Sequence, residues 1–217
     1  MSNTLTSPSH LDLPHGLEDR YLNNYEALAC IQSEYDKLNE SSDYEYVVRV
    51  TRLHAVTKLL LDHFAEKGII VTPRVQTNSA IIDLLVRMPD KRLFALMLRS
   101  SSGASVAWNE YRQEFFVNKV GQKNRKNDPL TRSISESQTI IDLKKERHPI
   151  VGASTNERNA PLIKAIVLAP GAKIAFAKSP TVQAQFGDAP VLKIKTTSIT
   201  YVVESENLIN FLLPVQK

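Results

Sequence analysis

The sequence contains a single cysteine, Cys30, among its 217 residues. One thiol excludes an internal disulfide and any metal site built from several cysteines, and it is typical of proteins from a reducing compartment. No apolar run approaches the roughly 20 residues that span a bilayer, and the first residues lack the basic and apolar regions of a signal peptide. We therefore expect a soluble, cytoplasmic protein that makes no contact with a membrane.

Several catalytic and nucleotide-binding motifs are also missing. The sequence has no G-x-x-x-x-G-K-[ST], no G-x-S-x-G and no G-x-G-x-x-G, so NTP hydrolysis, serine hydrolysis and dinucleotide binding have no support. The histidines form no metal-ligand pattern, because His54 and His63 lie on one predicted helix about 14 Å apart along its axis.

The composition is that of an ordinary globular protein. Hydrophobic residues make up 42% of the chain, which predicts a buried core. The 27 basic residues exceed the 23 acidic ones by a formal charge of +4. This modest excess permits an anionic partner such as nucleic acid without requiring one.

The pattern of the chain divides it into three parts. Residues 1–16 are rich in Ser, Thr, Pro and His, lack a period, and are expected to form a disordered arm. Residues 17–40 carry apolar side chains every three or four positions, which predicts an N-terminal helix with Tyr25 and Ile31 on its stripe. Residues 41–217 are expected to form one domain. It begins with a long amphipathic helix that Ser42 or Asp43 caps and Gly68 ends.

Strands are predicted after that helix. The runs "IIVTPRV", "AIIDLLVRM" and "RLFALMLRS" are β-branched or apolar, and "MPDK" provides a turn between the last two. The segment from Ser101 to Pro129 fits both helix and strand and stays open, whereas Pro129–Arg147 has helical spacing. Strands over 162–169, 172–177, 190–195 and 198–203 and a short C-terminal helix complete an α/β or α+β sandwich.

The second and third predicted strands carry a motif. Asp83 lies within "IIDLLV", and the following strand ends in "LMLRSSSG". A helix, then strands with an aspartate in the second, then a strand ending in acidic-x-Lys is the layout of the PD-(D/E)xK nuclease superfamily, and the chain most resembles its nuclease-related domain (NERD). The resemblance covers about residues 43–213. It implies a restriction-endonuclease-like mixed central sheet flanked by helices.

Two of the three catalytic positions differ from the family pattern. Asp83 matches the metal-binding aspartate, but Met97 stands in the glutamate position and Arg99 in the lysine position. A thioether is a poor ligand for Mg²⁺, and an arginine is a poor general base. The resemblance therefore implies a degenerate site, with Asp83 and Arg99 vestigial, that binds a phosphate better than it cleaves one and needs no cofactor.

Alternatives remain open at this point. A carboxylate from another element, namely Glu45, Glu66, Glu110 or Glu114, would complete a site for Mg²⁺ with Asp83 and make the chain an active endonuclease. Asp83 would equally form a structural ion pair with Arg87 or Arg99. In a further alternative the domain is a scaffold that binds no nucleic acid.

A basic segment offers contacts to a phosphate backbone. Lys119, Lys123, Arg125 and Lys126 lie close together among glycine and asparagine residues, as in loops that contact nucleic acid without reading its sequence. Aromatic residues precede this segment and would either pack in the core or stack on an exposed base; they are Trp108, Tyr111, Phe115 and Phe116. The expected partner is nucleic acid, and the resemblance implies that it is DNA. A DNA-processing protein is a further candidate.

Overall fold

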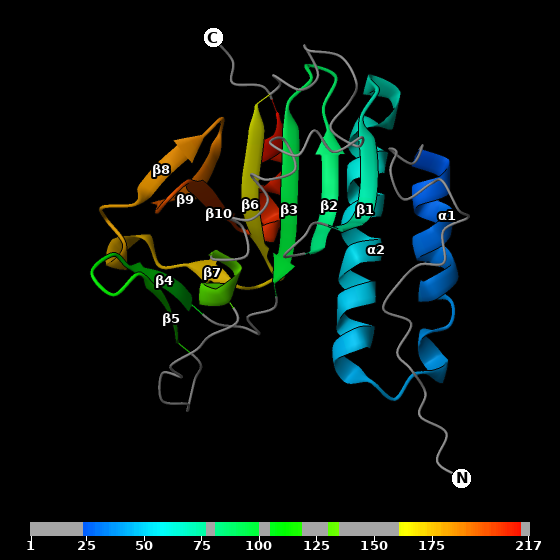
Figure 1. Cartoon of the computed structure of the whole chain (residues 1–217), viewed down its shortest axis with the longest axis horizontal. Coiled ribbons are helices and arrows are strands. Elements are labelled where there is room, and N and C mark those ends of the chain that lie inside the picture. The colour runs from blue at the N-terminus through cyan, green and yellow to red at the C-terminus, as the bar shows by residue number, and fades with distance from the viewer. Residues whose placement is uncertain (1–23, 77–80, 100–104, 119–129, 135–160, 214–217) are drawn as a thin grey trace.

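The computed structural model describes residues 24–76, 81–99, 105–118, 130–134 and 161–213, which build a layered α+β domain (Figure 1). The arm expected at residues 1–16 lies outside the described residues. So does most of the helix expected over Pro129–Arg147, of which residues 130–134 are described and helical. In the described part of the chain, no helix is both long and apolar enough to cross a membrane.

The helical elements largely follow the sequence pattern. They are α1 (Asn24–Tyr35), η1 (Leu38–Glu40), α2 (Tyr44–Phe64), η2 (Ala65–Lys67), η4 (Phe176–Lys178), η5 (Ser205–Asn207) and α6 (Leu208–Leu212). The carboxylate of Asp43 caps α2 by accepting the backbone N–H of Tyr46 at 3.1 Å. Gly68 adopts a φ of 84° where the chain leaves η2, a conformation that favours glycine. Both expected ends of this helical segment are therefore confirmed.

In the described ranges, ten strands form two sheets. Their bounds are β1 (Ile70–Gln76), β2 (Ile81–Arg87), β3 (Leu93–Arg99), β4 (Ser105–Asn109), β5 (Glu114–Asn118), β6 (Leu162–Leu168), β7 (Lys173–Ile174), β8 (Gln183–Phe186), β9 (Ala189–Lys195) and β10 (Ile199–Val203). The segment that fitted both helix and strand contains the β4–β5 hairpin. Strand β8 was not predicted, because its short "QAQF" sequence has little apolar content.

The central sheet is mixed and has the order β1-β2-β3-β6-β10-β9-β8. Strands β1, β2 and β3 pair antiparallel as an expected meander, whereas β6 pairs parallel with both β3 and β10. The chain thus crosses over between β3 and β6, and the hairpin strands β4 and β5 belong to that crossover. A small sheet of order β5-β4-β7 makes up the second layer of strands.

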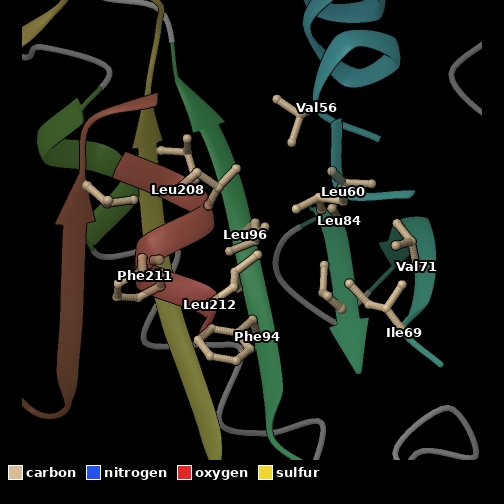
Figure 2. Close-up of a cluster of buried hydrophobic side chains, with 14 of the residues drawn as sticks. Val56, Leu60, Ile69, Val71, Leu84, Phe94, Leu96, Leu208, Phe211 and Leu212 are labelled. Atoms are coloured by element: carbon tan, nitrogen blue, oxygen red, sulfur yellow. The ribbon is translucent and has the colours of Figure 1, made fainter. Parts of the chain in front are cut away.

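One face of the central sheet is covered by helices, and we call it the helix face. Side chains from α2 and α6 pack against β1, β2 and β3, with Phe94 and Phe211 fully buried at the centre (Figure 2). The two rings meet edge to face at 5.5 Å between centroids, a favoured arrangement for aromatic pairs. Leu53, Leu60 and Phe64 of α2 lie in this cluster, so the apolar stripe of that helix is buried as expected.

The opposite face is covered by the small sheet, and we call it the small-sheet face. Val106, Trp108 and Phe115 from β4 and β5 pack onto side chains of β2, β3, β6 and β9, together with Leu130 and Ile134. Glu204 joins the layers, since its carboxylate accepts the backbone N–H of Ile174 at 2.8 Å. The domain therefore has three layers: helices, the central sheet and the small sheet.

The N-terminal helix packs on the domain. Ala27 and Ile31 are its buried residues, whereas Tyr25 is 83% exposed, so the expected placement of Tyr25 on the buried stripe was wrong. Glu34 receives two hydrogen bonds from the guanidinium of Arg74 on β1, both at 2.7 Å. Helix α1 is thereby tied to the edge of the central sheet.

Candidate functional site

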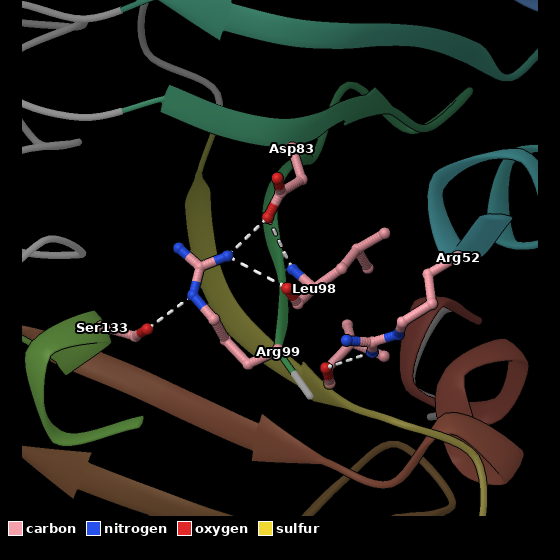
Figure 3. A network of polar contacts seen from close by, with 6 residues as sticks. Arg52, Asp83, Leu98, Arg99 and Ser133 are labelled. Atoms are coloured by element: carbon pink, nitrogen blue, oxygen red, sulfur yellow. Dashed lines mark hydrogen bonds and ion pairs between the residues drawn. The ribbon is translucent and has the colours of Figure 1, made fainter. Parts of the chain in front are cut away.

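Asp83 lies where the pairing of β2 and β3 ends. The last paired residues in this direction are Leu84 and Leu96. Beyond them, the carboxylate of Asp83 accepts the backbone N–H of Leu98 at 2.8 Å, so a side chain takes the place of a strand carbonyl (Figure 3). This bond gives a structural reason for an acidic residue inside an otherwise apolar strand, because the partly buried N–H needs an acceptor.

Arg99 binds the same carboxylate. Its Nη1 donates to Oδ2 of Asp83 at 2.7 Å and to the carbonyl of Leu98, while its Nε donates to Oγ of Ser133 at 2.6 Å (Figure 3). The side chains of Asp83 and Arg99 are 14% and 21% exposed. The resemblance expected these residues to lie together, and the structure brings them together as an ion pair, with Arg99 rather than Arg87 as the partner.

Met97 has a different role from its neighbours in the motif. Residues two apart on a strand face the same side, so Met97 and Arg99 both face the small sheet. Met97 is only 1% exposed and belongs to the apolar cluster with Ala95 and Ile166. A carboxylate at this position would be buried among hydrocarbon groups, which explains why a methionine packs well here.

Arg52 completes the site and was not among the residues predicted from the sequence. It comes from α2, on the opposite side of β3 from Ser133, and its guanidinium donates to the carbonyl of Val167 at 3.1 Å (Figure 3). Burial lowers the pKa of Arg52 to about 10; the charge of Asp83 raises it, and that of Arg99 lowers it further. A signal existed, because Arg52 precedes the buried Val56 by one helical turn and borders the apolar stripe of α2.

Among the described residues, positive charge outweighs negative charge around Asp83. Two guanidinium groups, from Arg52 and Arg99, share the neighbourhood of one carboxylate, and a pKa near 10 leaves Arg52 protonated at neutral pH. The site also lies at the carboxyl ends of β3 and β6, which run parallel. Ligands of open α/β sheets bind at such ends, and an anion is the ligand that this charge favours.

The residues do not fit the metal that the resemblance implies. Mg²⁺ requires several oxygen ligands, and the Asp83 carboxylate is already held by Leu98 and Arg99. Of the other candidates, Glu45 and Glu66 lie at opposite ends of the α2–η2 segment, and Glu110 and Glu114 lie on the β4–β5 hairpin. Within the described ranges, no three His, Cys, Asp or Glu side chains gather as a metal site.

The remaining candidates separate into two groups. Lys119, Lys123, Arg125 and Lys126 lie outside the described residues, so their contact with nucleic acid stays a prediction. Trp108 and Phe115 pack together in the core with ring centroids 4.8 Å apart, whereas Tyr111 is 96% exposed at the hairpin turn. Core packing is thus confirmed for two of the four aromatic residues.

Comparisons of the chain with family models, with curated proteins and with solved structures gave no match. The function is therefore inferred from the site itself.

Proposed function

We propose that the chain is a nuclease-related domain, similar to the PD-(D/E)xK superfamily, whose catalytic motif has degenerated and which binds nucleic acid. The observation that carries this proposal is the ion pair of Asp83 with Arg99 at 2.7 Å. The carboxylate that would hold a metal ion in an active member is instead neutralised by a guanidinium from the same chain. Duplex DNA is the partner that the resemblance favours.

The arrangement of the strands supports this proposal. The motif positions come from β2 and β3 of an antiparallel meander that follows a long helix, and a parallel strand, β6, lies beside β3. Asp83 and Arg99 come to the same end of the sheet, as a site derived from that superfamily requires. The mixed central sheet supports a restriction-endonuclease-like fold, which we include in the proposal, although the small sheet covers the face where the resemblance implied helices.

The charge of the site supports phosphate binding without cleavage. Among the described residues, the guanidinium groups of Arg52 and Arg99 lie near one carboxylate, that of Asp83, and guanidinium groups bind phosphate oxygens through paired hydrogen bonds. Neither residue is suited to removing a proton from water. The basic residues predicted at 119–126 would add contacts along the backbone of the nucleic acid.

Binding of a labelled DNA duplex at two or more salt concentrations tests the proposal. Arg52→Gln keeps the Asp83–Arg99 pair, so we expect a folded variant with duplex affinity reduced about fivefold and a salt slope lower by about 1. The control is Arg74→Gln, because Arg74 pairs with Glu34 in an ion pair between α1 and β1. Equal binding by wild type and Arg52→Gln would contradict the proposed site.

Cleavage is measured on the same duplex with Mg²⁺ and with Mn²⁺. We expect no metal-dependent product. Cleavage that disappears in Asp83→Ala would instead make the chain an active endonuclease, with a carboxylate supplied from outside the residues described. An absence of both binding and cleavage would favour the scaffold hypothesis, or a DNA-processing protein as the partner.

A further inference from the structure

A cavity of about 740 Å³ opens on the small sheet, away from the Asp83 site. The side chains of Val106 and Trp108 point into the core, so the alternation of β4 places Ser105, Ala107 and Asn109 on the outer side of the small sheet. These three residues line the cavity. A volume of this size falls in the range of pockets that hold ligands of roughly 300–1,000 Å³.

Hydrogen bonds to the backbone of β4 hold the walls of the cavity together. Ser179, which is fully buried, accepts the N–H of Trp108 at 2.9 Å through its hydroxyl, and the N–H of Ala175 donates to the carbonyl of Val106 at 2.7 Å. These bonds fix the segment 175–181 against β4. The cavity is therefore formed by the fold itself and needs no rearrangement to exist.

Aromatic rings line the opening. Tyr111 stands at the turn of the β4–β5 hairpin with 96% of its surface exposed, and the partly buried Phe116 lies on β5. A large ring with almost no contact in its own chain is available for stacking. Stacking on aromatic side chains is the main way in which proteins hold unpaired bases.

The polar groups offer both donors and acceptors. Oδ1 of Asn109 accepts the backbone N–H of Arg112 at 3.0 Å, which leaves its amide nitrogen to donate. Glu110 adds an acceptor, and Lys178 adds a donor of opposite charge. The two charges cancel, and a neutral heterocycle whose edge carries donors and acceptors suits such a lining better than a bare anion does.

We propose that this cavity binds an unpaired nucleobase, presented by a single strand or by a mononucleotide. The proposal rests on the proposed function and deepens it, because it names the form of nucleic acid that a second site of the domain recognises. Tyr111 stacks on the base, and Asn109 and Glu110 contact its edge. The Asp83 site contacts phosphate groups independently of the base.

Fluorescence anisotropy with a labelled 15-nucleotide oligothymidine and a blunt duplex of the same length tests this inference. We expect Tyr111→Ala to weaken binding of the single strand about tenfold, within the range known for loss of one stacked base, and to leave duplex binding unchanged. Tyr111→Phe should stay within about twofold of wild type, because a phenyl ring also stacks. Tyr25→Ala is the control, since Tyr25 is likewise exposed but lies on α1.

The outcomes separate this inference from the proposed function. Single-strand binding that Tyr111→Ala leaves unchanged, or that Tyr25→Ala weakens equally, overturns the cavity site. Duplex binding without single-strand binding also overturns it and leaves the proposed function standing, whereas binding of neither overturns both. Competition with thymidine monophosphate identifies the source: displacement shows that a free nucleotide suffices, and its absence assigns the cavity to a strand.

Discussion

The two faces of the central sheet differ in the kind of group that they bury. The helix face holds an aromatic and aliphatic cluster around Phe94 and Phe211. The small-sheet face holds both buried charged side chains of the described residues, Lys164 and Glu204. At the end of β3, Arg99 also points to this face and donates a hydrogen bond to Ser133. The helix face is therefore built for stability, whereas the other face also buries charged groups.

The difference teaches where chemistry can be placed in this fold. Lys164 aligns with Ala95 of β3, which faces the small sheet, and its ammonium is hydrogen-bonded to the hydroxyl of Ser198. A buried lysine without a carboxylate among the described residues lowers stability, and burial lowers its pKa to about 8.

The largest effect is expected on the helix face. Phe211 is fully buried and contacts the rings of Phe94 and Phe186, with centroids 5.5 and 4.6 Å away. We expect Phe211→Ala to reduce the free energy of unfolding by about 4 kcal/mol, because it leaves a cavity. Urea unfolding measures the loss, with Tyr25→Ala as an exposed control. A loss below about 1 kcal/mol would show that the helix face is not the main source of stability.

The next largest effect is expected from removing the acidic partner of each of the two ion pairs. Asp83–Arg99 and Glu34–Arg74 are similarly shielded from solvent, but Arg52 acts on Asp83, whereas Glu34 also accepts a hydrogen bond from the hydroxyl of Tyr46. We expect Asp83→Asn to cost about 3 kcal/mol and Glu34→Gln about 2 kcal/mol in urea unfolding. In an Arg52→Gln background the cost of Asp83→Asn should fall. Equal costs in both backgrounds would show that Arg52 and Asp83 are not coupled.

The third effect has the opposite sign. We expect Lys164→Met to raise the free energy of unfolding at pH 7 by about 2 kcal/mol, because it removes a buried charge. The folded pKa of about 8 lies below the value of about 10.4 for an unfolded lysine, so the wild type gains stability as pH rises through this window. The advantage of the variant should therefore shrink between pH 8 and 10.

The control for this effect is Lys195→Met, since Lys195 is exposed on β9. Urea unfolding at several pH values gives the difference between each variant and the wild type. An advantage of Lys164→Met that stays constant up to pH 10 would contradict the lowered pKa.

The smallest effect concerns a single cap in the helix layer. Asp43→Ala removes the acceptor of the Tyr46 N–H and should reduce the free energy of unfolding by about 1 kcal/mol. Ser42→Ala is the matched control, because Ser42 is the neighbouring residue and does not cap α2. Equal losses in both variants would mean that the cap at Asp43 is not the stabilising contact.

Local patterns predicted the helix face well. The Asp43 cap, the stripe of α2 and the meander β1–β3 depend on residues near one another in sequence. The position of β6 between β3 and β10 could not be predicted from local patterns. The pairing of β6 with β3 alone joins segments more than 60 residues apart along the chain. The β4–β5 hairpin was ambiguous since its aromatic spacing fits two periods.

The candidate site was predicted only in part. Asp83 and Arg99 were found from the motif, and their contact is a bond between neighbouring strands. Arg52 was missed because periodicity places it only at the border of the apolar stripe of α2, whereas its approach to Asp83 depends on how α2 packs on the sheet. The outer cavity depends on a similar long-range contact, that of Ser179 with Trp108.

The side chain of Asn24 has a consequence for the outermost strand. It donates to the carbonyl of Ile69 and accepts the N–H of Val71, so one amide copies the hydrogen bonds of an absent neighbouring strand. Pro73 has no N–H to offer further along β1, and at the other margin β8 has only four residues. An exposed edge strand can pair with other chains and lead to aggregation. Here the edge strand β1 is covered in part by Asn24, and the edge strand β8 is short. Helix α1 thus protects the domain against self-association through β1.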